Sequence, residues 1–171
     1  GIFIPVIVLF CSIAYVYAAQ DTDTQTSNVT LNVPESARLS ITAANASKTL
    51  NQGGDTEAAF DAGYVDFATA TPTLTVSANK KWKLYARSSN FAGPYAKSVA
   101  DLMIKDAGAS HVTNGFNDFK SLSLDDQEVA SHTGPIKKEN HLIQYRIILD
   151  WEKDVAGTYT ATVTYTLTTQ A

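Results

Sequence analysis

The chain has 171 residues, of which 13 are basic and 17 are acidic, and its formal net charge is −4. This length suits one domain of about 150 residues together with a short additional segment. The basic residues are scattered along the sequence and form no stripe, which argues against a nucleic-acid-binding protein. Cys11 is the only cysteine, so no disulfide can form within the chain and packing alone must stabilise the domain.

The N-terminal stretch from Ile2 to Ala19 is uncharged and almost entirely apolar. As a helix it would be about 27 Å long, close to the roughly 30 Å hydrocarbon core of a bilayer. Pro5 is tolerated in the first turn of such a helix. The small residues Ala18 and Ala19 would also suit signal-peptidase cleavage. An export signal, a membrane anchor and a helix that packs against copies of itself all fit this pattern, and we expect retention as a helix.

The rest of the chain predicts a mainly β protein. We expect three parts in the whole chain: an apolar α-helix over residues 1–19, a polar linker over residues 20–27, and an antiparallel β-sandwich head of immunoglobulin-like or jelly-roll type over residues 28–171. Alternating apolar residues and turn signals place the strands of this head. The predicted strands cover residues 28–33, 38–43, 63–67, 73–78, 82–88, 102–105, 116–124, 128–130, 142–151 and 158–168.

Three further expectations concern the connections and the faces of these strands. Residues 45–57 predict a loop, no amphipathic helix is expected in the head, and strands 73–78 and 82–88 are expected to pair as a hairpin. In the last two strands one face is apolar throughout, which indicates sheets with one wet face. The residues predicted to point inward are Ile143, Tyr145, Ile147, Leu149 and Trp151, and then Tyr159, Ala161, Val163, Tyr165 and Leu167.

The polar residues of the head predict no catalytic or cofactor chemistry. His111, His132 and His141 lack the spacing of a zinc site, and we interpret them as exposed residues of loops and strand edges. The acidic run Asp150, Glu152 and Asp154 is the best candidate cation site, but a solvated hairpin end explains it better. No nucleophile, base or phosphate-binding loop is present in a recognisable motif. We therefore expect no enzyme activity, no metal and no cofactor.

Two predictions concern sugars: attachment of glycans to this chain and binding of glycans by its aromatic residues. Asn28 and Asn45 each begin a tripeptide of the N-glycosylation type, and Asn45 is the better candidate because it lies in a predicted loop. Aromatic residues in predicted loops could instead stack on the sugars of a host or surface glycan. The candidates for that role are Phe91, Tyr95 and Phe116.

Two stretches carry a resemblance to known families. Ile4-Pro5-Val6-Ile7, followed by the apolar run, resembles the start of mature archaeal type IV-like pilins, which have an N-terminal helix and a β-rich head. Ile4 stands where those pilins have serine, and no glutamate of the bacterial type IV pilin kind is present. Residues 29–34 and 156–168 resemble the first and last strands of secreted prokaryotic surface domains. The resemblance implies a filament whose core is made of helices and whose heads face solvent.

We therefore expect an extracellular filament subunit, a pilin that assembles with copies of itself into a helical polymer on the cell surface, contacts the membrane before assembly and serves adhesion. The expected assembly residues are Ile4, Pro5, Val6, Ile7, Val8, Leu9, Phe10 and Ile13. An alternative has the apolar stretch cleaved and the 28–33 strand inserted into the sheet of the next subunit. A second alternative is a carbohydrate- or surface-binding adhesin module.

Overall fold

The computed structural model describes residues 25–51, 53–67 and 72–171. The chain divides into two units, Gly1–Val33 and Pro34–Ala171, and the second is here called the β-domain. Residues 25–33 belong to no helix or strand and are exposed. The predicted strand over 28–33 is therefore wrong for the single chain, because a strand needs a partner and no described strand pairs with it. The predicted helix over 1–19 lies outside the described residues.

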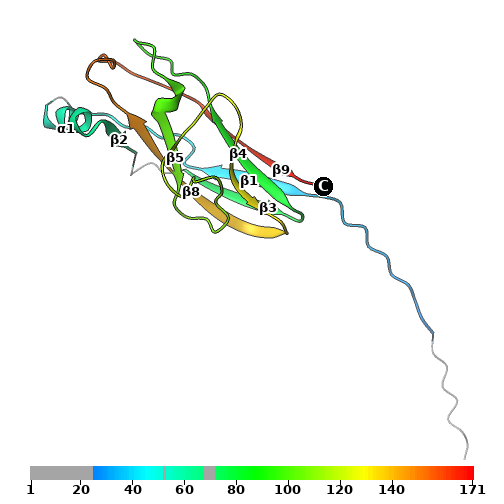
Figure 1. The fold of residues 1–171 in the computed structure, drawn as a ribbon. Coiled ribbons are helices and arrows are strands. Elements are labelled where there is room, and N and C mark those ends of the chain that lie inside the picture. The colour runs from blue at the N-terminus through cyan, green and yellow to red at the C-terminus, as the bar shows by residue number, and fades with distance from the viewer. Residues whose placement is uncertain (1–24, 52, 68–71) are drawn as a thin grey trace, which may run out of the picture. The chain divides into compact units, whose positions relative to one another are not determined.

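The β-domain contains two antiparallel sheets, which confirms the prediction of a mainly β protein (Figure 1). The first sheet has the strand order β1-β3-β8-β5-β6, and β2 pairs with β8; the second has the order β7-β4-β9. The elements are β1 (Ala37–Thr42), α1 (Gly54–Ala62), β2 (Tyr64–Asp66), β3 (Thr73–Ala78), β4 (Trp82–Ser88), the 3₁₀ helix η1 (Val99–Asp101), β5 (Leu102–Asp106), β6 (Lys120–Ser121), β7 (Gln127–His132), β8 (Ile136–Ile148) and β9 (Val163–Thr169).

One apolar core lies between the sheets and follows from the alternation in the strands. Strands β3 and β4 each bury every second side chain, so the apolar residues of both sheets meet in one cluster. The predicted hairpin of β3 and β4 is wrong, because β3 pairs with β1 and β8 whereas β4 pairs with β7 and β9. The turn at residues 79–81 carries the chain from one sheet to the other. Side chains of both strands therefore contribute to the core, but no hydrogen-bond ladder joins the two strands.

The last two predicted strands begin and end elsewhere than expected. β8 starts at Ile136 and ends at Ile148, so Trp151 lies in the following turn and is 57% exposed instead of pointing inward. β9 starts only at Val163, whereas the predicted strand began at residue 158. In the part before Val163, Thr160 forms an isolated bridge with Ala92. Within the predicted strand 116–124, only Lys120–Ser121 pairs, with β5.

A short helix occupies part of the predicted loop over residues 45–57. Gly53 precedes α1, acidic residues Asp55 and Glu57 lie in its first turn, and Gly63 ends it in the left-handed conformation at φ 77°. Carboxylates near a helix N-terminus and glycine after its C-terminus are both favourable. Ala59 is the only residue of this helix that is buried, so no apolar stripe in the sequence reveals it.

Candidate functional site

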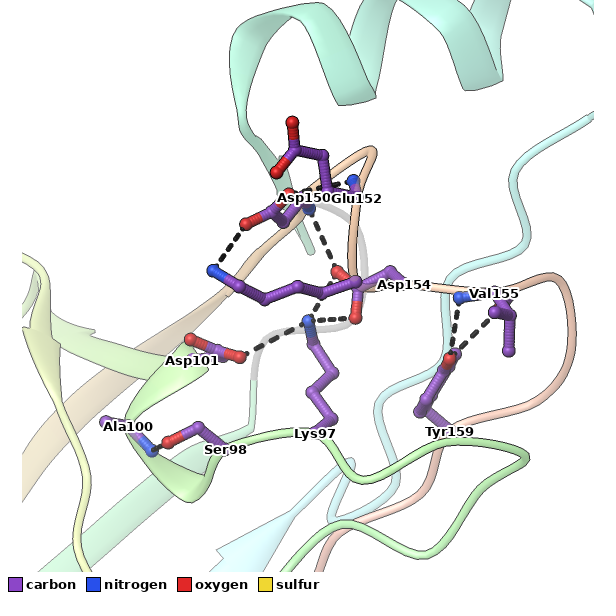
Figure 2. A network of polar contacts seen from close by, with 10 residues as sticks. Lys97, Ser98, Ala100, Asp101, Asp150, Glu152, Asp154, Val155 and Tyr159 are labelled. Carbon is purple, nitrogen blue, oxygen red and sulfur yellow. Dashed lines mark hydrogen bonds and ion pairs between the residues drawn. The ribbon is translucent and has the colours of Figure 1, made fainter.

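A buried lysine joins two loops that are far apart in the sequence (Figure 2). Lys97 lies in the loop before η1, and its Nζ donates to both carboxylate oxygens of Asp154, at 2.8 and 2.7 Å. Asp154 lies in the connection between β8 and β9, 57 residues further along the chain. The side chains are only 3% and 6% exposed. This ion pair is therefore largely removed from water, where charge interactions are stronger but desolvation is costly.

The groups around this pair form a polar network (Figure 2). A second carboxylate, that of Asp101, lies 3.5 Å from the Lys97 Nζ. The backbone N–H of Asp150 donates to Asp154 Oδ2 at 3.0 Å. Asp150 itself accepts from Lys153 and from the backbone N–H of Glu152, which lowers the pKa of Asp150. Two lysines therefore neutralise most of the acidic run.

This network corrects both interpretations of the acidic run. Asp154 is not part of a solvated hairpin end, since its side chain is buried against Lys97. Nor do Asp150, Glu152 and Asp154 converge on an open cation site, because ammonium groups occupy the oxygens of two of them. The sequence contained no local signal for Lys97, since an isolated lysine in a loop usually points to solvent.

The chain's histidines gather around Trp82. The His141 side chain is fully buried in β8, and its Nδ1 lies 2.6 Å from Asp106 Oδ2. The interpretation of His141 as an exposed residue is therefore wrong. His111 contacts Glu139 at 2.8 Å, and its ring lies 4.1 Å from that of His132. Both His111 and His141 meet the Trp82 ring edge to face.

Two edge strands of the β-domain come close without pairing. β1 is one edge of the first sheet and β9 is one edge of the second. They approach each other, and no ladder joins them among the described strands (Figure 1). Apolar side chains along both strands are only half buried or exposed. They are Leu39 and Ile41 of β1, and Val163, Tyr165 and Leu167 of β9. These edges could accept an additional strand.

The other predicted site residues are scattered. Asn28 and Asn45 are both exposed. Tyr95 is 53% exposed, whereas Phe116 is completely buried in the core and so cannot stack on a sugar. Phe91 is partly buried and packs against the core. The predicted assembly residues, Ile4 to Phe10 and Ile13, lie outside the described residues.

Two features are absent from the described residues. They contain no group of three or more His, Cys, Asp or Glu side chains that could hold a metal ion. Likewise, within residues 25–51, 53–67 and 72–171, no helix has both the length and the apolar character needed to cross a membrane.

Comparisons with known proteins gave weak structural likenesses, among them two pilus structures. No family model matches this sequence, and no curated protein matches it. The P pilus rod subunit PapA is 16% identical, with a TM-score of 0.39, over 78% of this chain and 99% of that one. A chaperone–usher pilus structure that addresses rod uncoiling is 14% identical, with a TM-score of 0.37, over 92% of this chain and 100% of that one. Both TM-scores are too low to establish a common fold.

Proposed function

We propose that this chain is a structural subunit of an extracellular filament and has no enzymatic role. The 28–33 segment joins successive copies by adding a strand to the β-domain of the next copy. The observation that carries this proposal is the exposure of its alternating apolar residues: Val29 is 92%, Leu31 81% and Val33 69% exposed. A row of apolar side chains with strand periodicity favours a partner that lies outside the chain.

The β-domain offers matching edges to such a strand. The inward side chains of β9 are Val163, Tyr165 and Leu167, three apolar residues at every second position, as in the 28–33 segment. At about 3.3 Å per residue, five residues of each strand cover the same length. A strand placed beside β9 would gain main-chain hydrogen bonds and cover the half-buried side chains of that edge.

Burial of the segment would supply a substantial driving force. Covering a large aliphatic side chain contributes about 1.5–3 kcal/mol. Val29, Leu31 and Val33 together could therefore offset much of the entropy lost when a subunit docks. Pro34 follows directly and has no N–H to donate, so the added strand would end there.

The geometry of such a contact favours a filament. The donating segment and the accepting edge are different surfaces of the same chain, so each copy can donate to one neighbour and accept from another. Heterologous contacts of this kind generate open helical assemblies when the rotation does not close. The β-domains would then be displayed on the outside, where they could serve adhesion.

A second form of assembly leads to the same function. Here the apolar segment of a type IV-like pilin is retained, and Ile4 to Phe10 and Ile13 pack with their copies in the filament core. The mature N-terminus distinguishes the two forms. A start at Gly1 in the mass spectrum of native filaments favours helix packing, and a start at Ala19 or Gln20 favours strand addition.

Matched substitutions test strand addition directly. Leu31→Lys places a charge on the apolar face of the segment, and Thr30→Lys places the same charge on the opposite face of a strand. Electron microscopy should show few filaments for Leu31→Lys and normal filaments for Thr30→Lys. Val8→Lys with Leu9→Lys should block assembly only if helices pack. The proposal would be contradicted if Leu31→Lys and the double variant Val8→Lys with Leu9→Lys both gave normal filaments. An absence of filaments from the unaltered chain would contradict it as well.

A further inference from the structure

We propose that Lys97 and Asp154 form an intramolecular isopeptide bond, an amide between the lysine Nζ and the aspartate Cγ. The two side chains already contact each other through both carboxylate oxygens, at 2.8 and 2.7 Å. Both are almost completely buried. This inference rests on the Lys97 network alone and does not depend on filament assembly.

Burial of the pair favours its conversion to an amide. An ammonium and a carboxylate lose their hydration when they are enclosed, and their mutual attraction only partly offsets that loss. Amide formation removes both charges at the same place. The new carbonyl oxygen can keep the hydrogen bond that the Asp150 backbone N–H now donates to Asp154 Oδ2 at 3.0 Å. In the product, neither Lys97 nor Asp154 therefore carries a buried charge.

The proximity of the Lys97 and Asp154 side chains also favours the reaction. Well-oriented groups held in contact react as though one were present at about 10⁵–10⁸ M. Lys97 and Asp154 are fixed from several sides: Asp101 lies 3.5 Å from the Nζ, and the Tyr159 ring lies 6.0 Å from it (Figure 2). Tyr159 in turn donates to the carbonyl oxygen of Val155 at 2.9 Å, which secures the chain next to Asp154. The two loops cannot readily separate the reacting groups.

The reaction balances without a further reagent. The Lys97 ammonium transfers one proton to an oxygen of Asp154, which gives an amine and a carboxylic acid. The nitrogen lone pair then attacks Cγ and forms the C–N bond, while the Asp150 N–H stabilises the negative charge that develops on Oδ2. Asp101 accepts a second proton from the nitrogen and delivers it to the Oδ1 hydroxyl, which leaves as water when the C–O bond breaks. No atom is oxidised or reduced.

The bond would connect the loop before η1 with the β8–β9 connection across 57 positions of sequence. The β-domain contains no cysteine, so no disulfide can provide such a cross-link. A covalent cross-link of this span restricts the unfolded chain in the same manner as a disulfide. Unlike a disulfide, it would resist reducing agents.

Intact-mass spectrometry of the purified, folded and then denatured chain tests the proposal. We expect a mass lower than the sequence mass by one water. A tryptic digest should contain one branched peptide that joins the segments around Lys97 and Asp154, and trypsin should not cleave after Lys97. The full sequence mass after prolonged incubation of the folded protein would overturn the proposal. A water loss that maps to any other residue would overturn it equally.

Two variants and one control sharpen the result. Lys97→Met, which keeps the length of the side chain, should restore the full mass for that sequence. Lys153→Met removes the exposed lysine that binds Asp150 and should still lose one water. Asp101→Asn should slow the reaction by about 10²-fold or more, the usual contribution of a proton-transferring group. An unchanged rate in Asp101→Asn would overturn the part assigned to Asp101.

Discussion

The Arg146 side chain makes both an ion pair and ring contacts in this domain. Its guanidinium donates from two nitrogens to both oxygens of Asp66, at 2.6 and 2.9 Å. It also stacks between the rings of Tyr64 and Phe119, whose centroids lie 3.8 and 4.0 Å away. Planarity allows both contacts at once, and the ammonium of lysine can reproduce neither the fork nor the stacking. Arg146 thus fastens the short strand β2 to β8.

Arg146→Lys should therefore lower the free energy of unfolding by about 1–2 kcal/mol, although the charge is kept. Urea denaturation measures this change. Arg87→Lys is the matched control, because Arg87 lies 3.7 Å from Asp126 in an exposed pair. That control should change the free energy of unfolding by less than about 0.5 kcal/mol. Equal effects of the two substitutions would show that the stacking of Arg146 contributes nothing.

A pair of tyrosines should make the domain sensitive to alkali. The hydroxyls of Tyr145 and Tyr165 lie 2.9 Å apart, and burial raises the pKa of both groups, that of Tyr165 well above its ordinary value. Between the unfolded and folded pKa values the native state keeps protons that the unfolded state has lost. The contribution of this pair to stability should therefore be constant below pH about 10 and fall as the pH rises beyond it.

Urea denaturation between neutral and strongly alkaline pH measures this loss. Tyr165→Phe removes the more strongly shifted group and should make the alkaline decline shallower. Tyr95→Phe is the control, because Tyr95 is 53% exposed. A decline of unchanged steepness in Tyr165→Phe would assign the alkaline instability to other groups.

At the scale of elements, α1 is a weakly packed part of the β-domain. Ala59 is its only buried residue. The Phe60 ring stacks on Trp151 at 4.5 Å, and the Trp151 Nε1 donates to Asp61 at 3.1 Å. These contacts attach the helix to the turn after β8. A nine-residue helix is marginal in isolation, so its order depends on such contacts.

Phe60→Ala should consequently release the helix and leave the sheets intact. Amide hydrogen exchange in residues 54–62 is expected to accelerate by at least about ten-fold, because a local contact of about 1.5 kcal/mol or more is lost. Exchange in β3, β4 and β8 should be unchanged. Acceleration throughout the sheets would mean that α1 belongs to the cooperative core.

Strands were easier to predict from this sequence than their partners. Alternation alone located β1, β3 and β4, because period-two burial is a local property. The separation of β3 and β4 into different sheets is a long-range property that alternation does not contain. The inward position of His141 could have been predicted, since it continues the register of Ile143 and Tyr145 on one face of β8.

The Lys97 network shows the limit of sequence reasoning for sites. Lys97 and Asp154 are 57 positions apart and lie in irregular segments, where no periodicity links one residue with another. Their contact depends on how the loop before η1 and the β8–β9 connection are folded. The 28–33 segment is the opposite case. Its alternation indicates a preference for the strand conformation, but no strand among the described residues of the same chain pairs with it.

At the scale of the whole molecule, the two sheets of the β-domain share one continuous core and need no disulfide. Leu84 is completely buried in this core. Leu84→Ala should lower the free energy of unfolding by about 2–5 kcal/mol, the usual effect of a cavity in a packed core. Thermal and urea denaturation measure the change. Tyr85 points to the other face of β4, so Tyr85→Ala should have a clearly smaller effect; equal losses would place the core elsewhere.

The division of the chain at residue 33 leads to the last prediction. Val29, Leu31 and Val33 are exposed, so removal of residues 1–33 should change the free energy of unfolding of the β-domain by less than about 0.5 kcal/mol. The truncated chain should be monomeric in analytical ultracentrifugation. If strand addition joins the copies as proposed, the truncated chain added to the full chain should stop filament growth, because it could accept a strand but would have none to donate. A large drop in stability on truncation would instead mean that the segment completes the β-domain of its own chain.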